Sequence, residues 1–242
     1  MILSRLTQAL KRQNWLAVIL EFVIVFMGVV IGFQFSMSSG DRADLQQEER
    51  IIRQLRLEIE DGIGLTEQFV RGREYRLEQL TQAAVIIQSN GDLELSEWQC
   101  AALRDSHVPF YDNVSIQTVD ELINSGATRV LRDDVLRERI FAYATAHARY
   151  REVIDLTQRM MISLSDNFPA AISYVASEDA WAAGDPVCNT AAMRDSPGFQ
   201  NALFGNIQRA TAFRDQTYND LEALTNIQER LDYILENGSP SN

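Results

Sequence analysis

The chain has 242 residues and a formal net charge of -12 at pH 7, a length that allows one or two domains. This acidic balance repels phosphate backbones and anionic lipid headgroups, so binding to nucleic acid is not expected. The charge is unevenly placed, because residues 1–14 carry Arg5, Lys11 and Arg12 without any acid, whereas all acids but Glu21 come after residue 40.

An apolar run over residues 15–33 follows the basic tail and contains one charged residue, Glu21. A helix of this length rises roughly 28 Å, close to the thickness of a bilayer's hydrocarbon core. We therefore predict a transmembrane helix over residues 15–37, after a cytoplasmic tail over 1–14. The positive-inside rule then exports residues 38–242. A signal peptide cleaved near 36–38 is the alternative, although the apolar run is longer than such peptides need.

Four residues of this segment form a candidate intramembrane interface. A carboxylate inside an apolar span is costly, so Glu21 is a candidate contact with a polar or cationic group of another helix. The alternatives are that it reaches the inner headgroups or is protonated. Gly28 and Gly32 form a G-x-x-x-G step, which lets two helices approach closely but also arises by chance. Gln34 could form a hydrogen bond near the outer interface.

Beyond the apolar run, apolar residues recur at helical spacing from about residue 41 to 88 and predict one long helix or two nearly continuous ones. Gly62 and Gly64 favour a kink in its middle. A short helix over residues 96–104 follows, and then an extended segment over 107–111. We expect Ser115 to cap the next helix and Gly126 to end it.

Asp133 or Asp134 is expected to cap a helix that runs to about residue 165. Residues 169–188 are less regular, and no segment shows the alternation of a strand. Ser196 and Pro197 open the last helix, which extends to about residue 237. Two long helices with shorter ones between them predict an antiparallel bundle, so the expected fold class is all-α, with a single N-terminal transmembrane helix before the bundle.

Cys100 and Cys188 are the two cysteines of the chain. In an oxidising compartment, two thiols of one exported domain often pair. The bond would close a loop of about 88 residues and stabilise the fold by roughly 4–5 kcal/mol in the chain-entropy model. The alternative is two unrelated thiols, because sequence spacing does not establish proximity.

Two segments resemble the domain-of-unknown-function family 6090, a bacterial family of uncharacterised membrane-anchored proteins. Residues 21–34 contain an acid, an aliphatic run, a glycine and a glutamine, as that family's signature does, and the acidic-basic helix over 48–61 also fits. Residues 111–143 resemble the family's middle. The chain departs from the pattern at Leu20, where the family has glycine, and at 35–37. The resemblance implies a single-span helical protein of the bacterial inner membrane with a periplasmic domain, and it supplies no catalytic residues.

No catalytic, cofactor-binding or metal-binding signature is present in the sequence. His107 and His147 show no ligand spacing to each other or to the cysteines, and His147 is expected to be a core or boundary residue. Neighbouring carboxylates such as Asp133 and Asp134 point about 100° apart on a helix. Capping and solvation therefore explain them better than an acid–base pair does.

These observations predict a membrane-anchored, non-enzymatic structural or interaction protein, either an accessory subunit of a larger membrane assembly or a self-associating protein. The expected partners are membrane lipid and other membrane protein subunits or a second copy, with no cofactor. The alternative is an extracytoplasmic ligand-binding sensor domain that acts through a partner. Trp98, Phe110 and Tyr111 could line its pocket, but we expect them in the core.

Overall fold

The computed structural model describes residues 15–89, 91, 93–108, 114–175 and 184–238, and the side chains of 15–18 and 31–43 lie outside that description. The chain forms two compact units, Met1–Arg50 and Ile51–Asn242. The described residues are mostly helical, so the predicted all-α class is confirmed.

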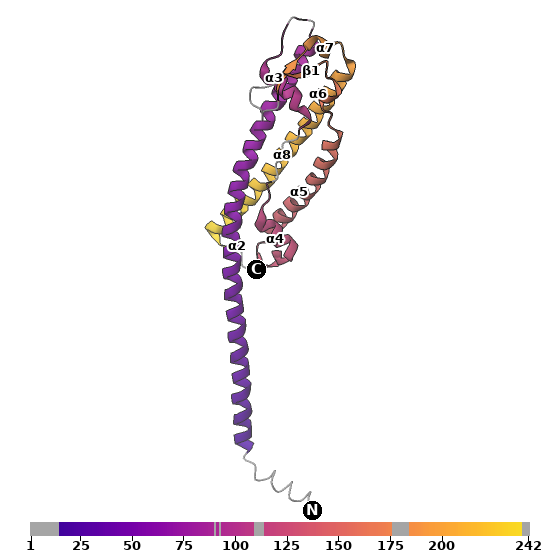
Figure 1. Ribbon diagram of the computed structural model, residues 1–242. Coiled ribbons are helices and arrows are strands. Elements are labelled where there is room, and N and C mark those ends of the chain that lie inside the picture. Colours follow the sequence, from indigo (N-terminus) through magenta and orange to yellow (C-terminus); the bar gives the residue numbers. More distant parts are fainter. Residues whose placement is uncertain (1–14, 90, 92, 109–113, 176–183, 239–242) are drawn as a thin grey trace, which may run out of the picture. The chain divides into compact units, whose positions relative to one another are not determined.

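Three long helices build the second unit. The later part of α2 (Trp15–Gln88) is joined there by α5 (Asp134–Met160) and α8 (Pro197–Asn237). Figure 1 shows α8 between α5 and this part of α2. Residues 52–59 of α2 pack with the end of α8, and residues 80–87 pack with its beginning, so these two helices are antiparallel. The predicted helical bundle with long first and last helices is therefore confirmed.

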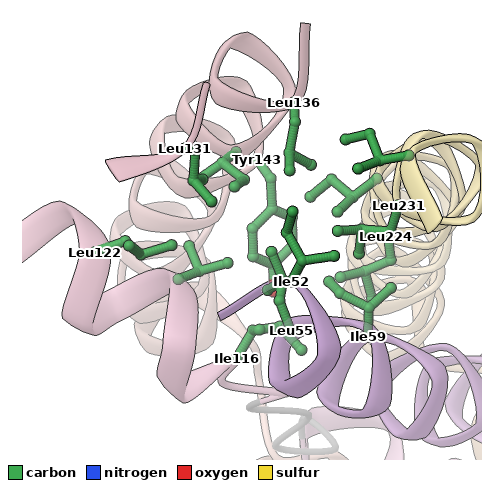
Figure 2. Packing of buried hydrophobic residues seen from close by; sticks show 14 residues of the cluster. Ile52, Leu55, Ile59, Ile116, Leu122, Leu131, Leu136, Tyr143, Leu224 and Leu231 are labelled. Atoms are coloured by element: carbon green, nitrogen blue, oxygen red, sulfur yellow. The ribbon is translucent and has the colours of Figure 1, made fainter. Parts of the chain in front are cut away.

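Two apolar clusters form the core of this unit. Figure 2 shows the first, in which Ile52, Leu55 and Ile59 of α2 point toward Tyr143 of α5 and Leu224 of α8. The second cluster lies at the other end of the bundle, where side chains of several helices surround the fully buried ring of Phe199. Burial of these apolar faces is the main favourable contribution to folding.

Shorter elements connect the long helices. They are α3 (Glu97–Arg104), η1 (Asp105–His107), α4 (Gln117–Ser125), η2 (Ala127–Val130), α6 (Leu164–Asn167), the strands β1 (Ile172–Val175) and β2 (Asp185–Cys188), and α7 (Thr190–Arg194). The strands pair antiparallel, with Ile172 opposite Cys188. The sequence analysis predicted no strand, and this was wrong. Each strand has four residues, and β1 buries only its first, so no alternating pattern could form.

Three helix starts agree with the sequence. The side chain of Ser96 accepts a hydrogen bond from the backbone of Gln99 in a capping box at α3. Asp133 rather than Asp134 caps α5, and Ser196 caps α8 with proline in its first turn. Local hydrogen bonds fix these three boundaries, and this explains why a pattern in the sequence could locate them.

The predicted cap of α4 was wrong. Ile116 stands at the N-cap position without a capping side chain, and the hydroxyl of Ser115 donates instead to Asp120, at 2.7 Å. Glu58 of α2 supplies the missing acceptor, because its carboxylate accepts hydrogen bonds from the backbone N–H and the hydroxyl of Thr118, at 2.8 and 2.7 Å. Burial acts to raise the pKa of Glu58, but these hydrogen bonds and one from Gln54 outweigh it and hold that pKa below its ordinary value.

Helix α5 ends at Met160, earlier than the sequence predicted. The amide of Asn206, a fully buried residue of α8, donates to the carbonyl of Ile162 at 2.8 Å and accepts from its N–H at 3.1 Å. These bonds satisfy the backbone between α5 and α6 where it leaves the helix.

Helix α2 passes through Gly62 and Gly64 without a break in the helix. A side chain at Gly62 would meet Ile116 Cδ1 at 2.8 Å, so this glycine permits close packing.

Candidate functional site

The first candidate site is the apolar part of α2 in the first unit. Nine large apolar side chains between residues 19 and 29 are exposed, with exposed fractions of 48% to 70%. Consecutive helical residues point about 100° apart, so these side chains surround the helix instead of forming one stripe. None of the helices, over the residues that the structure describes, offers a stretch both long and apolar enough to cross a membrane.

Two of the four predicted interface residues lie in this described stretch. Glu21 is exposed among the apolar side chains. A Cβ added at Gly28 would have no atom of the chain within 4 Å, so this glycine is not required by packing within one copy. Gly32 and Gln34 belong to α2, but their side chains lie outside the described residues.

The second candidate site is a polar layer in the second unit, between the two apolar clusters. A pocket there contains about 290 Å³ of space not filled by atoms, part of it open to solvent. Phe69, Tyr143 and Tyr150 supply aromatic walls, and His147 and Asp220 supply the titratable groups. The rings of Tyr143 and His147 stack at 5.5 Å, which makes His147 a half-buried boundary residue, as the sequence predicted.

Burial controls the electrostatics of this layer. It raises the pKa of Asp220 above its ordinary value, and the electrostatic interactions with His147 and Arg73, with a hydrogen bond from Gln216, offset this only in part. Burial also raises the pKa of Tyr143, whose hydroxyl donates to the carbonyl of Val114 at 3.2 Å. The tyrosine is therefore neutral and cannot serve as a base at neutral pH.

A neighbouring pocket between α2, η1 and α8 is lined by two arginines. The guanidinium of Arg73 lies 5.7 Å from the ring centre of Phe213 and donates to the hydroxyl of Tyr150 at 3.4 Å. Arg76 donates to the carbonyl of Val108 at 2.9 Å, and burial lowers the pKa of Arg76. The remaining wall is mostly apolar and includes Leu77, Met161 and Ala210.

No pattern in the sequence indicates this polar layer, because its contacts join residues far apart in the chain. Arg73 and Tyr150, for example, are 77 positions apart. The only local signal was the histidine on the inner face of α5. Trp98, expected in the core, is 69% exposed, so that prediction was wrong. Phe110 and Tyr111 lie outside the described residues.

The two cysteines are joined in the structure. Cys100 of α3 and Cys188 of β2 form a disulfide with an S–S distance of 2.07 Å, across 88 positions of sequence. The bond ties the strand pair to the end of the bundle that contains the second apolar cluster. Its role there is structural, because neither cysteine lies in the polar layer.

The polar layer contains two buried threonine hydroxyls, those of Thr66 and Thr217. No three His, Cys, Asp or Glu residues gather in a way that could hold a metal ion in the described part of the chain. In the polar layer, the hydroxyls of Thr66 and Thr217 donate to carbonyls of their own helices, at 2.7 and 2.8 Å. They are therefore engaged locally and are not activated nucleophiles.

Comparison with known proteins gives no relative from which a role could be transferred. No family model, no curated protein and no solved structure matches the chain.

Proposed function

We propose that this chain is a membrane-anchored, non-enzymatic interaction protein, either an accessory subunit of a membrane assembly or a self-associating protein. The observation that carries the proposal is the ring of exposed apolar side chains between residues 19 and 29. A helix that is apolar on every side is stable only when lipid or protein surrounds it completely. The apolar run of the sequence, 15–33, extends beyond these residues on both sides.

Charge supports lipid as the surrounding phase. The basic tail before the run and the acidic residues after it match the distribution that orients a single span with its N-terminus in the cytoplasm. Residues 38–242 would then lie in the periplasm of a bacterial cell, as the resemblance to family 6090 implies. An oxidising compartment of this kind would also maintain the Cys100–Cys188 disulfide.

Membrane extraction tests the anchor. The full chain, expressed in a bacterial host, should stay in the membrane pellet after a sodium carbonate wash. A variant with Ile24→Asp and Val29→Asp should move to the soluble fraction, because two carboxylates in the span oppose insertion. A wild-type chain that is washed off by carbonate would contradict the proposed anchor.

The intramembrane interface has its own test. Glu21→Leu combined with Gly28→Ile should lower the mass of the detergent-extracted particle, because a large side chain at Gly28 prevents the close approach of a second helix. One copy alone should tolerate the change, because Gly28 has room for a side chain within it. Val25→Leu is the matched control in the same helix and should leave the mass unchanged. If the double variant also keeps the wild-type mass, these residues do not mediate assembly.

A ligand-binding sensor that acts through a partner is the second candidate function. The pocket between α2, η1 and α8 favours it, because two guanidinium groups beside an apolar wall suit a small carboxylate with a short apolar chain. Propionate should raise the melting temperature of the full chain, and Arg76→Gln should abolish the rise. The control Arg71→Gln changes an arginine whose side chain is 67% exposed and should keep the response. Equal responses in wild type and Arg76→Gln would exclude this site.

A further inference from the structure

The pocket of the polar layer is lined by polar groups that can accept hydrogen bonds but have few protons to donate. The hydroxyls of Thr66 and Thr217 give their protons to carbonyls of their own helices, at 2.7 and 2.8 Å, so each oxygen has only acceptor capacity left. The hydroxyl of Tyr143 likewise donates to the carbonyl of Val114, at 3.2 Å. A group that binds in this pocket must therefore bring its own protons.

Two further acceptors belong to the same pocket. Nδ1 of His147 is buried and has no hydrogen-bond partner among the residues that the structure describes. With the ring proton on Nε2, this nitrogen is an acceptor. The carboxylate of Asp220 accepts from the amide of Gln216 at 3.3 Å, and its remaining lone pairs can accept more. A buried acceptor costs free energy until a donor reaches it, so a ligand that carries N–H groups is favoured here.

The charge of the pocket favours a cation. The described residues that line it include the carboxylate of Asp220 but no arginine or lysine. Arg73 lines the neighbouring pocket instead, where its guanidinium lies over the ring of Phe213. Burial is the main cause of the raised pKa of Tyr143, and the carboxylates of Asp220 and Asp120 raise it further, so the local potential is negative. A positive charge beside Asp220 would replace the hydration that this carboxylate has lost.

Aromatic rings form much of the remaining wall. Phe69, Tyr143 and Tyr150 line the pocket, and the imidazole of His147 stacks on the ring of Tyr143. Aromatic faces attract cations and can receive N–H groups. The enclosed part of the pocket has room for a group of about the size of a water molecule, and the rest opens to solvent. We propose that this pocket binds an ammonium group, either the free ion or the head of a primary amine whose remainder lies in solvent.

Water and alkali ions fit this wall less well. A water molecule accepts hydrogen bonds as well as donating them, but the hydroxyls of Thr66 and Thr217 have no proton left to donate to it. An alkali ion needs a shell of oxygen atoms in place of its hydration, whereas much of this wall is ring carbon. Ammonium is close to water in size, carries a positive charge and has N–H donors on every side. It therefore matches the acceptors and the carboxylate together.

This site is independent of the membrane anchor and of self-association, because its residues all belong to the second unit. It is also separate from the two arginines that would bind a carboxylate in the neighbouring pocket. Failure of the ammonium site would leave both of those proposals standing, and carbonate extraction and the response to propionate test them separately.

Thermal unfolding of the full chain in dodecyl maltoside at pH 7 tests the site. Ammonium chloride should raise the melting temperature above that in tetramethylammonium chloride of equal ionic strength, by about 3–5 °C at about tenfold excess over the dissociation constant. Tetramethylammonium is larger than the enclosed space and has no N–H group. Methylammonium distinguishes the two sources: a rise with it as well assigns the head of a primary amine, and a rise with ammonium alone assigns the free ion.

Three variants locate the response. Asp220→Asn should abolish it, because an amide has no charge to pair with ammonium, and this variant should fold at least as stably as wild type, because burial penalises the carboxylate. Asp215→Asn is the matched control on α8 and should keep the full response, since its side chain is 59% exposed and pairs with Arg214. His147→Phe keeps a ring beside Tyr143 but removes the nitrogen acceptor, and it should weaken binding about tenfold.

The two histidines of the chain give a direct readout of position. With carbon-13 at Cε1 of histidine, the resonance of His147, identified by its absence in His147→Phe, should shift as ammonium is added. The resonance of His107, whose Nδ1 lies 3.1 Å from the carbonyl oxygen of Arg104, should stay in place. The proposal is overturned if potassium or tetramethylammonium chloride stabilises the chain as much as ammonium chloride does, if Asp220→Asn keeps the response, or if the His147 resonance does not move.

Discussion

Replacing Asp133 by alanine should lower the free energy of unfolding of the second unit by about 3 kcal/mol. The side chain is 1% exposed and accepts three hydrogen bonds. Its Oδ1 accepts from the backbone N–H of Leu136 at 2.6 Å and from Nε of Arg230 at 3.0 Å. Its Oδ2 accepts from Nη2 of Arg230 at 2.5 Å. One carboxylate therefore caps α5 and joins it to α8.

The magnitude follows from these contacts. Loss of an N-cap costs about 1 kcal/mol, and hydrogen bonds between charged groups contribute about 1.5–3 kcal/mol. A fully buried pair that loses one partner can cost 3–5 kcal/mol. The side chain of Arg230, however, is 20% exposed and lies over the ring of Tyr233, at 4.6 Å. It can still reach water, which places the expected loss near the lower limit of that range.

The same pair gives a pH dependence. The hydrogen bonds from Arg230 hold the pKa of Asp133 below its ordinary value, although burial opposes them. A carboxyl with a lowered folded pKa stabilises the fold fully above its unfolded pKa of about 4. This contribution is lost as the pH falls through the lower folded value. The difference between wild type and Asp133→Ala should therefore shrink below about pH 4.

Urea unfolding of the full chain in detergent, followed by circular dichroism, measures the effect. Asp134→Ala is the matched control at the next position. The side chain of Asp134 is 69% exposed and pairs with Arg137 within the first turn of α5. An exposed pair of this kind contributes about 0.5 kcal/mol. Equal losses in the two variants would show that the Asp133–Arg230 pair does not hold α5 to α8.

Three further outcomes are expected. In the same urea titration, Gly64→Ala should stabilise the fold by about 1 kcal/mol through helix propensity. Gly62→Ala should give no gain or a loss, because its Cβ would meet Cδ1 of Ile116 at 2.8 Å. Changing both cysteines to serine should cost roughly 4–5 kcal/mol for the 88-residue loop, seen as a lower urea midpoint. Asp220→Asn should raise the melting temperature at pH 7, because burial raises the pKa of that carboxyl and penalises its ionised form. This gain should vanish below about pH 4, where the carboxyl is neutral in both the folded and the unfolded chain.

Features with a local cause were readable in the sequence. The long helices follow from apolar residues at helical spacing, and α8 begins where Ser196 and Pro197 predict. Asp133 was one of two candidate caps. The fold selected it because its buried carboxylate also accepts from Arg230 of α8, whereas the side chain of Asp134 is exposed. The start of α4 could not be found in this way. Its acceptor, Glu58, lies 60 positions earlier in the chain.

The two candidate sites differ in the same way, because one depends on consecutive residues and the other on contacts between distant helices. The apolar run and Glu21 are properties of consecutive residues, so composition and spacing are enough to single them out. The polar layer needs Arg73, Tyr143 and Asp220 from three different helices, which no local pattern brings together. Trp98 was misplaced because burial of a short helix depends on what packs against it.

The sequence by itself determined the helical class, the limits of the longest helices and the apolar segment with its basic tail, because each depends on residues within a few turns of one another. Only the tertiary structure decided which side of each helix is buried, which distant groups satisfy the helix ends and where the two strands pair. Those features depend on contacts between residues tens of positions apart. Helix α5 shows both contributions, because its apolar spacing is present in the sequence, but only the packed bundle decides that Leu136, Ile140 and Tyr143 are buried.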